Sequence, residues 1–131
     1  MIVRGLDEVL GTENDVSGPG WNSRRLLLAG DGMGFSLSDT LILPGAEMVL
    51  EYRHHFEACY CIEGRGEVMA HASGIWQAIE PFTVYALDLH DRHILRAFGE
   101  GMRLVCTFNP GLSGQEVHRA DGSYAPVGDQ G

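Results

Sequence analysis

Three side chains spread over the middle of the chain have the chemistry of a metal site. Glu57 offers a carboxylate, Tyr85 a phenol and His93 an imidazole, so all three donate through oxygen or nitrogen. Such a donor set suits Fe(II), with Mn(II) and Zn(II) as alternatives. Ionising the tyrosine, whose reference pKa is about 10, would require the charge of the cation. Each residue also has a plain structural interpretation, because a strand tyrosine usually packs in a core and a glutamate before a turn is usually solvated.

Short apolar stretches separated by turn residues predict the elements that must position these side chains. The chain holds 18 glycines and 5 prolines, many of them between the apolar stretches. The expected strands are 23–29, 34–43, 47–53, 57–63, 66–72, 75–80, 83–88, 93–98 and 102–109, with one short helix at 6–11. Many short strands at regular spacing are typical of a β-sandwich or barrel. A small closed barrel alternates inward and outward side chains and leaves room inside for one small ligand.

The stretch around Glu57 has the spacing of the first sequence motif of the cupin superfamily. Six residues separate Glu57 from Gly64. In that motif the glutamate points into the barrel and the glycine makes the turn to the next strand. The two histidines that usually precede the glutamate are missing. His54 and His55 are near but out of phase, and a one-residue slip moves a strand side chain to the other face.

A second cupin-like motif runs from Pro81 to His93, with Tyr85 in the strand between them. Alternation along that strand can turn the tyrosine inward. The two motifs together predict an all-β fold, a single-domain cupin-type β-barrel (jelly roll) with at most short helical turns. The barrel is expected over residues 1–118. Residues 119–131, where apolar content falls, are expected to form a loose C-terminal tail.

Composition and charge narrow the range of partners and compartments. A chain of 131 residues suits one domain, and its formal net charge of -9 argues against nucleic acid or an anionic membrane as partner. No apolar run approaches the roughly 20 residues of a membrane span, and the acidic N-terminus is unlike a secretory signal. The three cysteines, Cys59, Cys61 and Cys106, are therefore expected to be reduced in a cytoplasmic protein. The first two alternate along one strand and are expected to pack in the core, because no second Cys or His pair stands at zinc-finger spacing; a pair of soft zinc ligands is the alternative.

Five segments along the chain carry a more specific resemblance. They are "SRRLLLAGDGMGFS", "HFEACYCIEGRGE", "VYALDLHDRHILRA", "CTFNP" and "GQEVH" with the following "DGSY". Through them the chain resembles the ectoine synthase family over nearly its whole length. The resemblance implies an iron-dependent cytoplasmic cupin, usually a homodimer. Such an enzyme closes a small molecule, N-γ-acetyl-L-2,4-diaminobutyrate, into the compatible solute ectoine with loss of water.

The resemblance also implies which residues form the site. It assigns the iron ligands to Glu57, Tyr85 and His93, the set that the spacing already suggests. The substrate-binding residues that it implies are Trp21, Arg25, Ser38, Thr40, Tyr52, Cys106, Phe108, Glu116 and His118, with Thr40, Tyr52, Glu116 and His118 as the catalytic candidates. Ser38 departs from the family, which often has Asn or His at that position.

The chemistry of the reaction suggests roles for some of these residues. Arg25 suits a bidentate pair with the substrate carboxylate, and a surface ion pair is the alternative. Glu116 and His118 alternate and can transfer protons on one side, although a Glu-x-His near a C-terminus is often solvent-exposed. Two other functions stay open. Ser38 and the altered stretch "FNPGLSG" at 108–114 favour a paralogue acting on a related N-acyl diamine. The missing histidine pair favours a cupin that binds a small ligand without catalysis.

Overall fold

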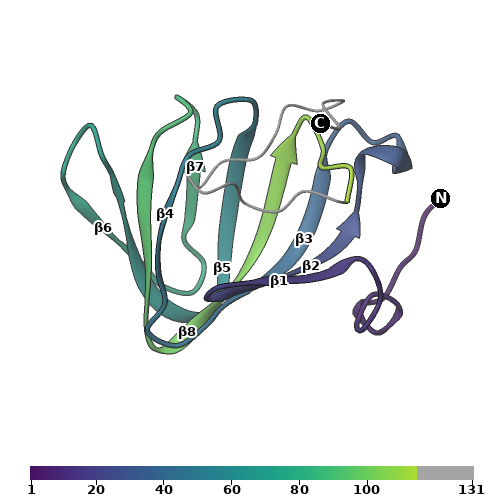
Figure 1. Ribbon diagram of the computed structural model, residues 1–131, viewed down its shortest axis with the longest axis horizontal. Coiled ribbons are helices and arrows are strands. Elements are labelled where there is room, and N and C mark those ends of the chain that lie inside the picture. The colour runs from purple at the N-terminus through teal and green to yellow at the C-terminus, as the bar shows by residue number, and fades with distance from the viewer. Residues whose placement is uncertain (115–131) are drawn as a thin grey trace.

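Strands make up more than half of the residues that the structure describes (Figure 1). The computed structural model describes residues 1–114. Two short 3-10 turns are present, η1 (Leu6–Glu8) and η2 (Ala29–Asp31). The strands are β1 (Asp15–Gly18), β2 (Trp21–Leu27), β3 (Ser36–Ile42), β4 (Glu47–Leu50), β5 (Phe56–Ala70), β6 (Trp76–Ile79), β7 (Val84–Leu87) and β8 (His93–Asn109). The prediction of an all-β fold is confirmed.

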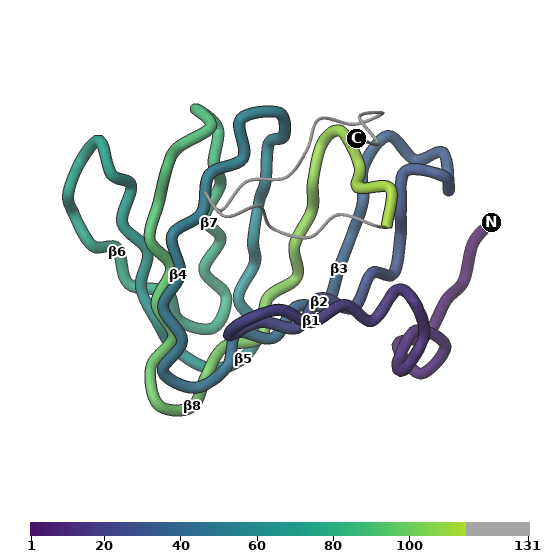
Figure 2. Tube along the Cα trace, viewed as in Figure 1, coloured from purple at the N-terminus to yellow at the C-terminus, as the bar shows by residue number. Residues whose placement is uncertain are grey.

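Two long strands, β5 and β8, form the frame of one antiparallel sheet. The strand order is β1-β2-β3-β8-β5-β6, while β4 pairs with β8 and β7 pairs with β5. The first part of β8 pairs with β4, and its last part pairs with β3. In the same way β5 pairs first with β7 and then with β6. The sheet therefore folds back on itself, and Figures 1 and 2 show the two walls meeting where β5 and β8 bend.

Glycines at this bend let the backbones approach closely. The pairing of β5 with β8 shifts register on both sides of Gly64, which has a φ of 81°. A Cβ at Gly64 would overlap the carbonyl oxygen of Gly101, and a Cβ at Gly101 would lie 2.7 Å from the carbonyl oxygen of Ile42. Only glycine adopts such a backbone without strain. The turns predicted at Gly64 and at 99–101 are therefore wrong, because these glycines make bulges inside two continuous strands.

Inward and outward side chains alternate along β5, as a half-buried strand requires. Glu57, Cys59 and Cys61 are buried, whereas Phe56 and Tyr60 are exposed. The inward residues join one hydrophobic core, which consists of Trp21, Ile42, Leu50, Tyr52, Cys59, Cys61, Val68, Ile79, Leu87, Leu95, Ala97, Met102, Leu104, Cys106, Phe108 and Leu112. Each large side chain buried in this way contributes about 1.5–3 kcal/mol. This core holds the two walls together.

The N-terminal part differs from the prediction. The helix expected at 6–11 is only the single turn η1, which begins at Leu6 and ends at Glu8. Strand β1 was not predicted, because "DVSG" contains just one large apolar side chain. The segment nonetheless forms a strand because it pairs with β2, with Val16 opposite Ser23. Tertiary pairing here outweighs weak local propensity.

Within residues 1–114 the helical elements are two three-residue turns, and neither could span a bilayer. The predicted end of the barrel at residue 118 and the predicted tail over 119–131 lie outside the described residues.

Candidate active site

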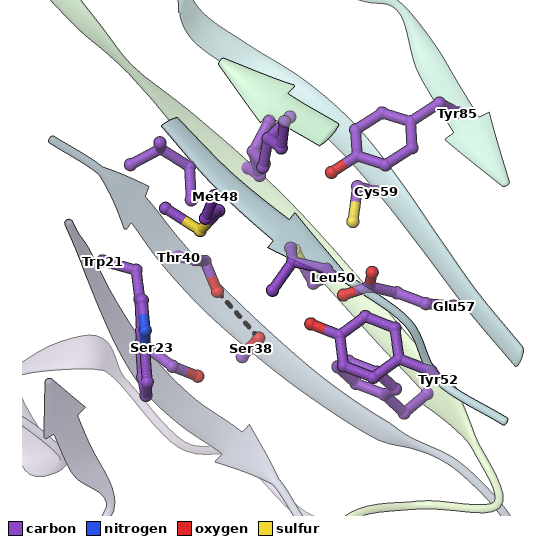
Figure 3. A pocket seen from close by; sticks show the side chains of 15 residues that line it. Trp21, Ser23, Ser38, Thr40, Met48, Leu50, Tyr52, Glu57, Cys59 and Tyr85 are labelled. Atoms are coloured by element: carbon purple, nitrogen blue, oxygen red, sulfur yellow. Dashed lines mark hydrogen bonds between the residues drawn. The ribbon is translucent and has the colours of Figure 1, made fainter. Parts of the chain in front are cut away.

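A cavity lies between the two walls of the sheet, and most of its lining comes from β2, β3, β4, β5, β7 and β8 (Figure 3). The lining residues are Trp21, Ser23, Ser38, Thr40, Ile42, Met48, Leu50, Tyr52, Glu57, Cys59, Tyr85, Leu95, Leu104, Cys106 and Phe108. Most of this surface is apolar. The polar groups gather in two places, with Ser38 and Thr40 on one side and Glu57, Cys59 and Tyr85 on the other. A polar ligand would be oriented by these two groups of atoms.

Glu57 is the second residue of β5, and its carboxyl group points into the cavity (Figure 3). Burial raises the pKa of this carboxyl from 4.5 to about 8, and a hydrogen bond with Cys59 opposes the shift only in part. At neutral pH the group therefore keeps its proton unless a positive charge comes close. A divalent cation would favour the ionised form. A buried carboxyl of this kind has the properties of a metal ligand.

Two thiols and a phenol lie next to this carboxyl. Cys59 is opposite Tyr85 in the β5–β7 pair and opposite Cys106 in the β5–β8 pair. A carboxylate oxygen of Glu57 and the Sγ atoms of the two cysteines lie within 4.8 Å of one another. Tyr85 is half-buried as a residue, but its hydroxyl points inward toward the Cys59 thiol. Burial first, and then the neighbouring acidic groups, raise the pKa values of Cys59 and Tyr85 well above their ordinary range.

His93 is the first residue of β8 and is fully buried. Its Nδ1 lies 2.9 Å from the carbonyl oxygen of Asp91, so this nitrogen carries the proton and donates it. Its Nε2 is buried and has no hydrogen-bond partner among residues 1–114. Burial also lowers the pKa of the ring. The imidazole is thus neutral, with the Nε2 lone pair available and the opposite nitrogen anchored, as in metal-binding histidines.

The predicted metal ligands differ in their relation to the cavity. Glu57 and Tyr85 belong to its lining, as alternation along β5 and β7 predicted. His93 is not among the lining residues. It pairs with Leu50, and its ring centroid lies 6.1 Å from that of Tyr52. The structure thus places Glu57 and Tyr85 in the cavity wall. It places His93 outside the lining, next to Tyr52, which is itself a lining residue.

Most of the predicted substrate-binding residues also meet in this cavity. Those that line it are Trp21, Ser38, Thr40, Tyr52, Cys106 and Phe108. The hydroxyls of Ser38 and Thr40 are 3.0 Å apart and form a hydrogen bond. The rings of Tyr52 and Phe108 pack edge to face at 5.1 Å. Glu116 and His118 lie outside the described residues.

The two neighbouring arginines of β2 have separate roles. Arg24 forms an ion pair with Asp39 at 2.6 Å, and Arg103 binds the same carboxylate. Arg25 is opposite Ser38 in the β2–β3 pair and is only 2% exposed. Its Nη1 donates to the carbonyl oxygen of Gly114 at 2.9 Å. The alternative of a surface ion pair is therefore wrong for Arg25, although this residue is not part of the cavity lining.

Two residues near the site were not predicted as part of it. Cys59 was assigned to core packing, and the structure buries it in the cavity wall beside Glu57. His55 was excluded because it is out of phase with the strand. It lies in the connection before β5, where strand alternation does not apply, and it is 1% exposed. Its ring packs edge to face on Phe108 at 5.8 Å. In the sequence, the adjacent histidines His54 and His55 just before Glu57 were the feature that could have indicated a histidine near the site.

Comparison with known proteins agrees with this geometry. The family model described as ectoine synthase matches residues 1–128. An L-ectoine synthase of Desulfatibacillum aliphaticivorans is 56% identical over 98% of this chain and 100% of its own length. An L-ectoine synthase of Halomonas elongata is 51% identical over 97% of this chain and 93% of its own length.

Solved structures agree as well. A crystal structure of ectoine synthase from P. lautus superposes with a TM-score of 0.83 at 53% identity, covering 87% of this chain and 81% of that one. A cupin-2 domain from Rhodospirillum rubrum has a TM-score of 0.62 at 22% identity, over 76% of this chain and 67% of that one, and it shows the fold alone. The barrel is therefore a cupin, and the chain belongs to the ectoine synthase family.

Proposed function

We propose that this chain is an L-ectoine synthase, a lyase that closes N-γ-acetyl-L-2,4-diaminobutyrate into ectoine with loss of water. The observation that carries the proposal is the identity of about half of all residues, over the full length, with relatives of that name. The gathering of six implied substrate-binding residues around one cavity supports it. Membership of an enzyme family favours this function over a cupin that only binds a ligand.

The reaction makes definite demands on the site. The 2-amino group of the substrate attacks its own acetamide carbonyl, and both hydrogens of that amine finally leave with the carbonyl oxygen as water. The flexible chain must be held in a nearly cyclic pose, which removes an entropic barrier to ring closure. Trp21 and Phe108 supply aromatic walls for this pose and exclude water. The hydroxyl pair of Ser38 and Thr40 offers fixed polar contacts on one side.

The substrate carboxylate needs a cationic partner. Arg25 is a charged donor inside the molecule and lies beside Ser38, so we assign the carboxylate to its guanidinium. The hydroxyl of Tyr52 points toward the Glu57 carboxyl (Figure 3), where it can orient that group or pass a proton to the departing oxygen. Glu116 and His118 remain our candidates for the other proton transfers.

The donors fit a divalent cation. His93 has a buried Nε2 without a hydrogen-bond partner among the described residues, and Glu57 has a buried carboxyl whose pKa is raised. We propose that Glu57, Tyr85 and His93 hold Fe(II), with Mn(II) or Zn(II) as alternatives. When bound with open positions, the cation would act as a Lewis acid and withdraw electron density from the amide carbonyl.

We also propose a cytoplasmic homodimer without nucleic-acid or membrane partners. The net charge of -9 supports the absence of such partners, since both attract basic surfaces. Sedimentation equilibrium of the purified protein measures the assembly, and a monomer at micromolar concentration would contradict it.

A second candidate keeps the chemistry and changes the acyl diamine. Ser38 supports it, because this departure from the family lies in the cavity lining and binds Thr40. Ser38→Asn tests this candidate. The variant should shift the ratio of kcat/KM values between the acetyl substrate and longer N-acyl analogues if the second candidate is correct.

The test of the main proposal is an NMR assay of the purified protein, with and without added Fe(II) under anaerobic conditions. Resonances of the closed ring should appear from the acetylated diamine only with the metal. Folded, metal-loaded protein that leaves the substrate unchanged would refute the proposal. Glu57→Ala should lose iron and activity together, and full activity in this variant would remove Glu57 from the ligand set.

A further inference from the structure

The wall of the cavity contains a second set of donors that shares one residue with the first. The Sγ atoms of Cys59 and Cys106 and a carboxylate oxygen of Glu57 lie within 4.8 Å of one another. All three residues are buried, at 1%, 3% and 8% exposure. Cys59 and Cys106 are directly opposite each other in the β5–β8 pair, and both are free cysteines. Hydrophobic packing alone does not require two thiols and a carboxyl to bring their ligand atoms together at one place.

The geometry is close to that of a bound soft cation. Zinc bonds of about 2.3 Å to sulfur and about 2.0 Å to oxygen place tetrahedral donors roughly 3.5–3.8 Å apart. The three atoms need to approach by little more than an ångström at most, which small side-chain rotations on fixed strands can supply. The Tyr85 hydroxyl points toward Cys59 and offers a fourth donor on the same side of the cavity (Figure 3).

We infer that Glu57, Cys59 and Cys106 form a binding site for a thiophilic divalent cation such as Zn(II) or Cd(II). Thiolates select soft cations, whereas carboxylate, phenolate and imidazole suit harder ones. On binding, each thiol loses its proton to solvent and its sulfur donates an electron pair to the cation, with no change of oxidation state. The inference depends on these donor atoms and not on the proposed ectoine synthase activity.

Because Glu57 belongs to both sets, the two sites exclude each other. A cation held by the two thiols would occupy the carboxylate that the set with Tyr85 and His93 also needs. A soft cation such as Cd(II) would therefore be held by the thiols, and Fe(II) by Glu57, Tyr85 and His93. Thiophilic ions would act as competitors of Fe(II) at this carboxylate.

The chain offers a matched control in Cys61. This cysteine is as buried as Cys59 and is on the same face of β5, two residues further on. Its thiol lies 3.3 Å from the carbonyl oxygen of Glu63, and it is not a member of the donor cluster. Cys59→Val and Cys61→Val thus remove the same group from neighbouring places in one core, and only the first should affect the site.

The test uses the full chain, stripped of metal with a chelator and kept under a phosphine reductant so that no disulfide forms. Cd(II) is added stepwise, and the ultraviolet sulfur-to-metal charge-transfer absorption is followed. The wild type should give a band that saturates at one equivalent, and Cys61→Val should give the same band. Cys59→Val should weaken Cd(II) binding at least tenfold and lose about half of the band. Glu57→Gln should keep the band and bind several-fold more weakly.

Circular dichroism and a thermal melt establish that each variant is folded, and Cys59→Ser replaces Cys59→Val if the latter is not. An unchanged band in the folded Cys59 variant, or a loss confined to Cys61→Val, would overturn the inference. So would a wild type without a saturable band. Failure of the ectoine assay alone leaves this result untouched, because the absorption is measured without substrate.

Discussion

Replacing Glu57 by glutamine should remove a large pH dependence from the stability of the metal-free protein. Burial raises the pKa of the Glu57 carboxyl to about 8 in the folded protein, against 4.5 for the unburied group. The folded state therefore binds this proton more tightly than the unfolded state. As pH rises from about 4.5 to 8, the unfolded chain loses the proton first, so the free energy of unfolding falls. Glutamine cannot ionise and does not incur this loss.

The size of the effect follows from the two pKa values. They differ by about 3.5 units, which corresponds to about 5 kcal/mol when the difference is fully expressed. About 3–4 kcal/mol of this should develop between pH 5 and pH 8. A domain of this size is stable by roughly 5–15 kcal/mol, so the change is easily measured.

The assay is urea unfolding followed by tryptophan fluorescence at several pH values, after removal of metal. The difference between wild type and Glu57→Gln isolates this one carboxyl, because all other titrating groups are common to both. Glu80→Gln is the control, since Glu80 is 57% exposed and pairs with Arg65 on the surface. Its free energy of unfolding should stay close to that of the wild type, because an exposed ion pair contributes only about 0–1 kcal/mol. If the Glu57→Gln difference changes by less than about 1 kcal/mol between pH 5 and 8, the reasoning about a buried carboxyl fails.

Three other predictions concern the bend, the substrate and the metal. Gly64→Ala should destabilise the protein by more than about 3 kcal/mol, since its Cβ would overlap the Gly101 carbonyl. Gly74→Ala, also at positive φ but in open space, should cost only about 1–2 kcal/mol in the same urea assay. Equal costs would contradict the packing argument. Arg25→Ala should raise KM by roughly 10–100-fold in the NMR assay through loss of a charge-assisted bond, and Arg65→Ala should not. His93→Gln should weaken Fe(II) binding by at least about tenfold in equilibrium dialysis, and unchanged binding would exclude it as a ligand.

Alternation accounts for what the sequence could predict about the site. Glu57 and Tyr85 are on strands that really are half-buried, so a period of two correctly turned them inward. The same rule gives no information on His55, because the backbone leaves the strand pattern between β4 and β5. It could not distinguish Arg24 from Arg25 either. The ion pair of Arg24 with Asp39 on the neighbouring strand is visible only in the structure.

The bend shows a second limit of sequence reasoning. Glycine-rich stretches were interpreted as turns, giving two short strands in place of β5 and two in place of β8. The sequence shows only that a glycine is present. It does not show whether the chain reverses there in a turn or whether the glycine forms a bulge within a strand that continues. The distinction depends on the Gly101 carbonyl lying against the backbone of Gly64, a contact between residues far apart in the chain.

The continuity of β5 limits how this protein can change its length. Glu57 near the start of the strand and Gly64 at the bend are separated by a fixed number of residues, and each must meet its own partner on β8. Adding or deleting one residue between them would turn the Glu57 carboxylate outward, or would move Gly64 away from its close contact with the Gly101 carbonyl at the bend. Insertions are harmless only in the connections, such as the one between β5 and β6. The number of residues between Glu57 and Gly64 is thus set jointly by the position of the carboxylate and by the position of the bend.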